Sequence, residues 1–389
     1  MTEACIVGWA HTPFGKLEDP DVEALIARVA RTAIDDARID PSDVDGVFVS
    51  LFNNGFSKQD FPASLAMQSV PELRFTQATR FENACASGSA AIHGARDFLA
   101  AKRGRFALVI GAEKMTATAS PQVGDILLSA AYRKEEGDIP AGFAGVFGKI
   151  AESYFQKYGD QSDALATIAA KNHKNGVDNE YAQMRRDLDF DFCRTASDKN
   201  PYVAPPLKRT DCSMVSDGAA ALVLTTEDIA KSMNKAVRFR AAVQVNDFLP
   251  LSRRDPTAFE GAAKAFHRAL SQAGLTLADL DFAEVHDCFT IAELLVVEAM
   301  GLAPSGQGAK PILDGVTQKI GRLPINVSGG LKAKGHPIGA TGVSMHAIAA
   351  MQLTGTAGPM QLPKADRGLV FNMGGAAVAN YVSVLEPLK

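Results

Sequence analysis

One order of elements occurs twice along the 389 residues, and this repeat constrains the fold more than any other feature. In the first half, a helical stripe of apolar residues over 22–37 leads into a polar turn that ends at Asp45, and a short apolar run follows. In the second half, a stripe over 259–270 leads into a similar turn that ends at Asp281, 236 positions after Asp45. Alternating amphipathic helices and buried strands predict an α/β fold made of two similar halves.

Two further matches support the duplication. A strand and a bend precede an Ala-rich helix at Cys85, and we predict the same sequence of elements at 326–330, before a helix over 341–353. Closing strands are predicted at 106–111 and again at 369–372. We therefore expect sheets that are covered on both faces by helices.

The composition changes between the halves. From residue 119 to 208 the buried strands stop, and helices are indicated over 144–158 and 164–176. A stretch of this length is better interpreted as an inserted subdomain than as a loop. The run 216–224 then returns to the strand pattern and should complete the sheet of the first half. We predict three units: 1–118 plus 209–232 as the N-terminal half, 119–208 as the inserted loop domain, and 233–389 as the C-terminal half.

The overall charge and the cysteines limit the possible partners and compartment. A net charge of −4 and a pI near 6.0 argue against nucleic acid or an anionic membrane as the main partner. The five cysteines are scattered without a C-x-x-C pair, so neither a disulfide framework nor a zinc site is predicted. Because no signal peptide or long apolar run is evident, we expect a cytoplasmic protein without a membrane span.

Cys85 stands where a strand bends into a helix, among the small residues Ala86, Ser87 and Gly88. The unpaired N–H groups at the start of that helix would stabilise negative charge on its sulfur. The alternative is a buried packing residue, which is common for cysteine among small neighbours.

A second candidate is the glycine-rich loop 329–342, which holds His336 between Gly335 and Pro337. Such a loop is rigid enough to present an imidazole. A phosphate cradle is a rival interpretation, although the glycine spacing fits neither common phosphate motif. The third interpretation is a structural turn in which the histidine only forms local hydrogen bonds.

Two more candidates lie at the ends of predicted strands, where reactive groups collect in α/β sheets. His286-Asp287-Cys288-Phe289 places a histidine two residues from a cysteine. The stretch 372–376 could supply backbone N–H groups for an oxyanion hole, although glycine at a strand end is usually only a turn.

Taken together, Cys85-Ala86-Ser87-Gly88, Ser216-Asp217-Gly218-Ala219, His286-Asp287-Cys288-Phe289 and Gly335-His336-Pro337 resemble, in order, the motifs of the thiolase superfamily. The His-Asp-Cys-Phe motif is similar to the sterol-carrier-protein type. The resemblance implies a duplicated α/β core layered α-β-α-β-α with an inserted loop domain. It also implies a thiolase-type acyltransferase, usually a homodimer or tetramer, that uses coenzyme A and acyl-CoA as substrates with no permanently bound cofactor and no metal.

The resemblance also implies roles for single residues. Cys85 would be the nucleophile, His336 the base that activates it, and His286 a ligand of the thioester oxygen. Asn372 occupies the place of the usual second cysteine, so Cys288 would replace that cysteine as acid and base. The residues implied for the oxyanion holes are Cys85, His286, His336 and Gly374.

Two alternatives stay open at this point. One is a decarboxylating ketoacyl synthase, which uses a similar Cys-His-His set. The other is a non-catalytic scaffold that works with a small acyl-CoA-binding partner protein. The acyl group and the coenzyme A contacts are not specified by any motif, and the basic residues considered for the phosphates are Arg133, Lys134, Arg253 and Arg254.

Overall fold

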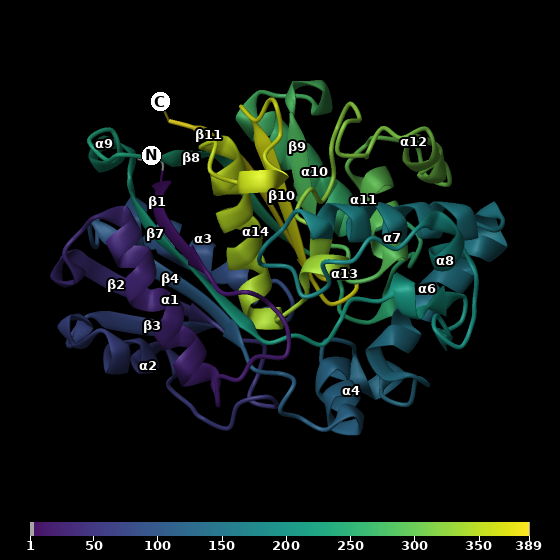
Figure 1. The fold of residues 1–389 in the computed structure, drawn as a ribbon, viewed down its shortest axis with the longest axis horizontal. Helices are drawn as coiled ribbons and strands as arrows, with labels where there is room; N and C mark the ends of the chain where they lie inside the picture. The colour runs from purple at the N-terminus through teal and green to yellow at the C-terminus, as the bar shows by residue number, and fades with distance from the viewer. Residues whose placement is uncertain (1–3, 389) are drawn as a thin grey trace.

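The computed structural model describes residues 4–388, and nine of its strands form one mixed sheet (Figure 1). Its order is β3-β2-β4-β7-β1-β8-β11-β10-β9. The strands of the first half are β1 (Ala4–His11), β2 (Val44–Ser50), β3 (Gln77–Phe81), β4 (Phe106–Glu113) and β7 (Gly218–Thr226). Those of the second half are β8 (Val237–Asn246), β9 (Phe282–Val285), β10 (Gly368–Gly374) and β11 (Ala379–Pro387).

The two halves are joined at the middle of the sheet, where Cys5 and Ile6 of β1 pair with Arg238 and Val237 of β8. The sequence led us to expect a sheet in each half. The short antiparallel pairing of β1 with β8 joins the sheets of the two halves into one.

Two helices fill the space between the halves. Helix α3 (Ser87–Ala100) packs on β2 and β4, and α14 (Ile338–Leu353) contacts strands of both halves (Figure 1). All 16 residues of α14 are buried. The two helices approach so closely that a Cβ on Gly88 would lie 2.7 Å from the backbone nitrogen of Val343. This contact brings the start of α3, next to Cys85, against the helix that follows His336.

Helices also cover the outer faces, which completes the α-β-α-β-α layering. Helix α1 (Val22–Ala37) packs on β1, β7 and β4, and α10 (Glu260–Ala273) packs on β8 and β11. The predicted stripe over 22–37 is thus confirmed. Asp21 caps this helix by accepting from the N–H of Ala24. The other helices outside the insertion are α2 (Pro62–Ser69), α9 (Glu227–Ala230), α11 (Thr290–Ala299), α12 (Ala309–Leu313) and α13 (Gly330–Lys334).

Between β4 and β7 the chain makes a helical excursion, which lies at the right and lower right of Figure 1. Its elements are α4 (Ser120–Leu128), α5 (Arg133–Glu136), α6 (Gly142–Tyr158), α7 (Ser162–Val177), α8 (Phe190–Arg194), β5 (Tyr202–Ala204) and β6 (Leu207–Lys208). The limits that we predicted for the three units stay a prediction.

One predicted repeat element is wrong. Residues 326–330 do not follow a full strand, because Ile325 makes only an isolated bridge with Ala283 and Asn326 adopts a left-handed backbone conformation with φ of 58°. Within residues 4–388, none of the helices has the length and apolar character needed to cross a membrane.

Candidate active site

Cys85 lies between the end of β3 and the first turn of α3, and only 4% of its surface is exposed. Its sulfur faces the backbone N–H of Gly375 and its own N–H, and both favour a thiolate. Burial outweighs them and raises the pKa of the thiol to about 12. The resting side chain is therefore a neutral thiol that needs a base.

His336 is held at both its backbone and its ring. Its N–H donates to Ser216 Oγ at 2.9 Å, and its Nδ1 lies 2.6 Å from Thr341 Oγ1. The Thr341 hydroxyl donates its own hydrogen to the carbonyl of Pro337, so its oxygen must accept from His336 Nδ1–H. The Nε2 of His336 is therefore the atom with the free lone pair, as a general base requires.

His286, directly after β9, has the opposite arrangement. Asn372 Oδ1 accepts from Ser89 Oγ at 2.8 Å, which makes the Asn372 amide nitrogen the donor on its other side. That nitrogen donates to the Cys85 carbonyl at 3.1 Å and to His286 Nδ1 at 3.0 Å. The proton of His286 must then sit on Nε2, a buried atom with no protein partner. His286 is thus a hydrogen-bond donor with no acceptor in the free protein.

These side chains converge. One ligand atom each of Cys85, His286 and His336 lies within 4.8 Å of the others. The two imidazole rings are edge to face, with centroids 5.1 Å apart and planes at 84°. Burial, together with the charge of Lys334, lowers the pKa of His336 to about 3, and burial likewise lowers the pKa of His286 far below its usual value. Both rings are therefore neutral.

Cys288 lies close enough to Cys85 for the two sulfurs to interact, and burial raises its thiol pKa far above the usual value. It is 2% exposed, and its carbonyl accepts from the N–H of Ser213 at 2.9 Å. A neutral thiol near Cys85 can donate a proton. The structure thus brings Cys85, His286 and His336 within 4.8 Å of one another and places Cys288 near enough to interact electrostatically with Cys85.

Between His286 and Cys288, the carboxylate of Asp287 ties the end of β9 to the glycine-rich loop. It accepts from the N–H of Leu331 at 2.7 Å and from Asn172 Nδ2 at 2.8 Å. A Cβ on Gly330 would lie 2.2 Å from this carboxylate, so only glycine fits there. The contact fixes the chain that carries His286 relative to the chain that carries His336.

Two family descriptions match the chain: "Thiolase, N-terminal domain" over residues 4–189 and "Thiolase C-terminal domain-like" over residues 243–387. The chain is 34% identical over 378 residues to acetyl-CoA acetyltransferase from Methanothermobacter thermautotrophicus, which covers 96% of this chain and 97% of that protein. This chain belongs to the thiolase family. It is an acyltransferase of the thiolase type, and neither a decarboxylating synthase nor a scaffold is favoured.

Other proteins are similar to this chain in sequence or in fold. The thiolase is 31% identical over 398 residues to human sterol carrier protein 2, which covers 96% of this chain and 70% of that protein. Its fold matches the solved structure of the "Ltp2-ChsH2(DUF35) aldolase" with a TM-score of 0.84, 20% identity and coverage of 100% and 98%. The fold also matches the solved structure of acetyl-CoA acetyltransferase from Syntrophomonas wolfei, with a TM-score of 0.71, 19% identity and coverage of 99% of both chains.

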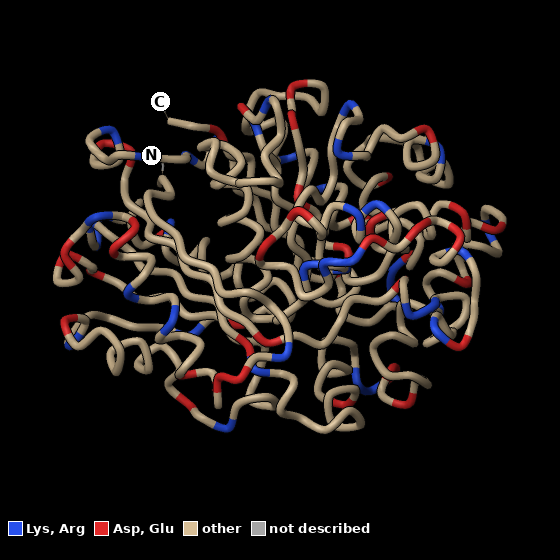
Figure 2. Tube along the Cα trace, viewed as in Figure 1, with Lys and Arg blue, Asp and Glu red and all other residues tan. Residues whose placement is uncertain are grey.

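A cavity of about 520 Å³ lies between α7, α13 and the segment 184–214. Basic side chains line it: Arg186, Lys199, Arg209 and Lys332. In Figure 2 a run of blue segments lies beside α7 and over α13. The cavity wall at Met214 adjoins Ser213, whose N–H donates to the carbonyl of Cys288. This cavity therefore adjoins the segment that contacts the site.

His173 is the least exposed polar group in the cavity wall. It is 1% exposed, and neither ring nitrogen has a partner in the structure. Burial, with the charge of Lys332, lowers the pKa of its imidazole to about 3. A neutral imidazole in such a wall can donate one hydrogen bond to a bound molecule and accept another.

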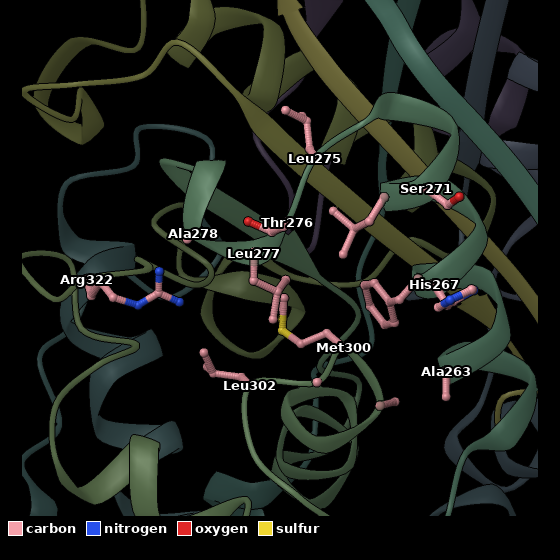
Figure 3. A pocket seen from close by; sticks show the side chains of 14 residues that line it. Ala263, His267, Ser271, Leu275, Thr276, Leu277, Ala278, Met300, Leu302 and Arg322 are labelled. Atoms are coloured by element: carbon pink, nitrogen blue, oxygen red, sulfur yellow. The ribbon is translucent and has the colours of Figure 1, made fainter.

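A surface hollow of about 750 Å³ lies elsewhere (Figure 3). Leu277 and Met300 lie at its centre, with Arg322 on one side and His267 on the other (Figure 3). It lies beyond the far end of α11, whose ten residues extend about 15 Å from Phe289. None of the predicted site residues lines it.

The sequence did not show how several supporting residues act. Thr341 and Ser216 orient His336, and within the predicted stretch 372–376 the N–H of Gly375 faces the Cys85 sulfur. Asn372 was noted only as the replacement of a cysteine. The one available signal in the sequence was Thr341, a residue with a hydroxyl group that stands five positions after His336 near the start of a helix.

Proposed function

We propose that this thiolase forms an acyl-cysteine intermediate on Cys85 and exchanges acyl groups between a 3-ketoacyl-CoA and coenzyme A. The observation that carries this proposal is that the two imidazoles near the Cys85 sulfur are held in opposite tautomers. His336 offers a lone pair from Nε2, whereas His286 offers a proton from Nε2. One ring is set to take the thiol proton, and the other is set to bind an oxyanion.

The first half-reaction follows from these roles. His336 Nε2 takes the proton of Cys85, and the thiolate attacks the 3-keto carbon, forming a C–S bond. The C2–C3 bond then breaks, and its electron pair moves onto acetyl-CoA as an enolate. The His286 Nε2–H stabilises the enolate oxygen, and Cys288 donates a proton to C2.

In the second half-reaction, the thiol of coenzyme A attacks the acyl group on Cys85. We assign the oxyanion of this step to the N–H of Cys85 together with the N–H groups at Gly374 and Gly375. The C–S bond to Cys85 breaks and the acyl-CoA leaves, while the thiol proton of coenzyme A passes to Cys288 and His336 returns its proton to Cys85. Every step can run in reverse as a Claisen condensation.

We assign the basic cavity of about 520 Å³ to coenzyme A. Arg186, Lys199 and Arg209 are suited to its phosphates, since guanidinium and ammonium groups bind phosphate oxygens strongly. The pantetheine arm would then pass His173 and Lys332 toward Cys288. Of the residues considered from sequence, Arg133 pairs with Asp125 instead, and Arg253 stacks on Phe248.

For assembly, we propose a homodimer or tetramer that uses the free edge of the sheet at β3. This edge strand has exposed and half-exposed residues, and Phe75 and Phe61 beside it are 88% and 78% exposed. An uncovered sheet edge with exposed aromatic rings is suited to pairing with a second chain. We further propose a cytoplasmic location, since all five cysteines are free thiols. A small acyl-CoA-binding partner is a further proposal, supported by the similar fold of the aldolase whose name pairs Ltp2 with ChsH2.

Thiolysis of acetoacetyl-CoA by the purified protein tests the proposed reaction. We expect two acetyl-CoA for each acetoacetyl-CoA consumed, and we expect Cys85→Ala to abolish this reaction. A malonyl-CoA control should release no carbon dioxide at a matching rate. Condensation that matches carbon dioxide release would contradict the proposed reaction.

A further inference from the structure

Three side chains of the types that bind zinc meet at the catalytic cluster. Cys85, His286 and His336 each place one ligand atom within 4.8 Å of the others, and all three residues are buried. A thiolate and imidazoles are ligands that suit Zn²⁺, and three protein ligands are enough for a zinc site with one open position. Ligand atoms around tetrahedral Zn²⁺ are about 3.3–3.8 Å apart, given bonds of about 2.0–2.3 Å. A shift of about 1 Å would therefore let the cluster close around one zinc ion.

His336 is already in the tautomer that a metal needs. Its Nδ1–H donates to Thr341 Oγ1 at 2.6 Å, so its Nε2 carries the lone pair. A zinc-binding histidine commonly has this arrangement, with one N–H held by an oxygen acceptor and the other nitrogen free. Cys85 has only to lose the proton of its thiol, because zinc binds the thiolate.

His286 is held in the opposite tautomer, which cannot bind a metal through Nε2. Its Nδ1 accepts from Asn372 Nδ2 at 3.0 Å, so the proton sits on Nε2. Among residues 4–388, this Nε2 has no hydrogen-bond partner, and it is buried. Moving the proton to Nδ1 would free Nε2 for a metal, but it would set the N–H groups of His286 and Asn372 against each other.

The amide of Asn372 is fixed on both sides and cannot easily turn to relieve this clash. Its nitrogen also donates to the carbonyl of Cys85 at 3.1 Å, and its oxygen accepts from Ser89 Oγ at 2.8 Å. A half-turn of the amide would set its oxygen against the Cys85 carbonyl, which would place two acceptors together without a hydrogen between them. Since an unpaired buried acceptor is costly, Asn372 holds His286 in the donor tautomer.

We propose that Cys85, His286 and His336 form a latent zinc site, and that Asn372 keeps zinc out of it by locking the tautomer of His286. A zinc ion bound here would occupy the Cys85 thiolate and the His336 lone pair at once, and so would block acyl transfer. Its binding would release one proton, that of the Cys85 thiol, while the proton of His286 moves from Nε2 to Nδ1. This assignment goes beyond the proposed function, because it concerns metal affinity and not the acyl group that is transferred.

Substitutions of Asn372 test the lock. Asn372→Asp replaces the donor by an acceptor, so that the Nδ1–H of His286 gains a partner and Nε2 is freed. A carboxylate that holds a histidine in this way raises its affinity for zinc. Asn372→Ala removes the donor without adding an acceptor. We expect a wild-type Kd for Zn²⁺ of about 1 µM or weaker, binding about 10–100-fold tighter in Asn372→Asp, and an intermediate value in Asn372→Ala.

The affinity is measured on reduced, chelator-treated protein by competition with a fluorescent zinc indicator. Co²⁺ gives a second readout, since a thiolate ligand produces a charge-transfer absorption band in the near ultraviolet. Equal affinities in the wild-type protein, Asn372→Ala and Asn372→Asp would overturn the proposal, as would a wild-type Kd in the nanomolar range. Should Asn372→Asp not fold, the wild-type protein and Asn372→Ala decide the matter.

Two double variants show where the metal binds. His286→Ala and Cys85→Ala, each combined with Asn372→Asp, should return the affinity to the wild-type value or below it. If the gain survives in the His286→Ala background, the new carboxylate itself binds the metal, and the proposal is wrong. Thiolysis of acetoacetyl-CoA is a separate measurement. A wild-type protein that fails to cleave acetoacetyl-CoA, with an Asn372→Asp variant that binds zinc tightly, would contradict the proposed reaction and support the zinc site.

Discussion

Asn372 Nδ2 lies 3.0 Å from His286 Nδ1, and this contact decides which nitrogen of His286 carries the proton. The motif of the thiolase family usually has a cysteine at the position of Asn372. Here the amide is also held by Ser89 and by the carbonyl of Cys85, so it cannot rotate without losing two hydrogen bonds. The substitution therefore gives His286 a fixed tautomer, and the proton donor of the reaction has to come from elsewhere.

The tautomer of His286 can be tested at Asn372. Asn372→Ala removes the donor, and we expect kcat for thiolysis of acetoacetyl-CoA to fall about 10–100-fold, as for other groups that orient a catalytic histidine. Asn372→Asp should be more damaging, because a carboxylate accepts from Nδ1–H and leaves Nε2 without a proton. Steady-state kinetics of both variants provides the measurement. Wild-type activity in Asn372→Asp would contradict the assigned tautomer.

The orientation of His336 depends on Thr341. Thr341→Val keeps the shape of the side chain and removes the oxygen that accepts from Nδ1–H. We expect the rate of acetylation of Cys85 by acetyl-CoA to fall about 10–100-fold. Thr341→Ser retains the hydroxyl and is the matched control, with a rate near that of the wild-type protein. A Thr341→Val protein that is acetylated at the wild-type rate would show that His336 does not need this contact.

Cys288 is assigned to proton transfer at carbon and not to acyl transfer. We therefore expect Cys288→Ala to accept an acyl group from acetyl-CoA at a rate close to that of the wild-type protein, whereas thiolysis of acetoacetyl-CoA drops about 10²–10⁴-fold. Single-turnover acetylation and steady-state thiolysis, measured on the same preparation, separate the two steps. An equal loss in both would indicate that Cys288 only supports the structure.

Glu113 links the stability of the protein to pH through the loop that carries His336. One oxygen of its carboxyl accepts from the N–H groups of Phe52 at 2.8 Å and Gly339 at 3.0 Å, and the other has no partner. Burial raises the pKa of this carboxyl to about 8, above the usual value of 4.5. The folded state therefore holds a proton that the unfolded chain releases, and stability is lost as pH rises from about 4.5 to about 8.

Glu113→Gln keeps the accepting oxygen and has no proton to lose. We expect its melting temperature to fall less between pH 5 and pH 8 than that of the wild-type protein, as measured by thermal unfolding. Glu113→Ala is the contrasting variant, and it should be less stable by about 1–3 kcal/mol because two buried N–H groups lose their acceptor. An identical pH dependence in the wild-type protein and Glu113→Gln would mean that Glu113 is ionised in the folded state.

The elements with a strong local pattern could be predicted from sequence. The stripe over 22–37 forms α1 at those bounds, and the run 282–285 forms β9, because periodicity and end signals agree there. The strand expected at 326–330 is not formed, since Asn326 adopts a left-handed conformation and its side chain accepts from the N–H of Val285. That interaction joins residues 41 positions apart, and no local pattern reports it.

The candidate site shows the same division. Strand ends and glycine-rich loops indicated Cys85, His286, Cys288 and His336 as a group. The contacts that set their protonation, such as Asn372 with His286, join residues 86 positions apart and depend on how the halves pack. The charge of Arg254 could be read from the sequence, but its contact with the carbonyl of Ala376 could not, since 122 residues separate them.

The central claim is that Cys85 carries the acyl group, and mass spectrometry tests it most directly. The wild-type protein is incubated with acetyl-CoA, quenched in acid and digested. The account predicts one acetyl group per chain, located on the peptide that contains Cys85, and none on Cys85→Ala. An acetyl group that remains covalently bound to Cys85→Ala, or that maps to a different residue of the wild-type protein, would contradict it.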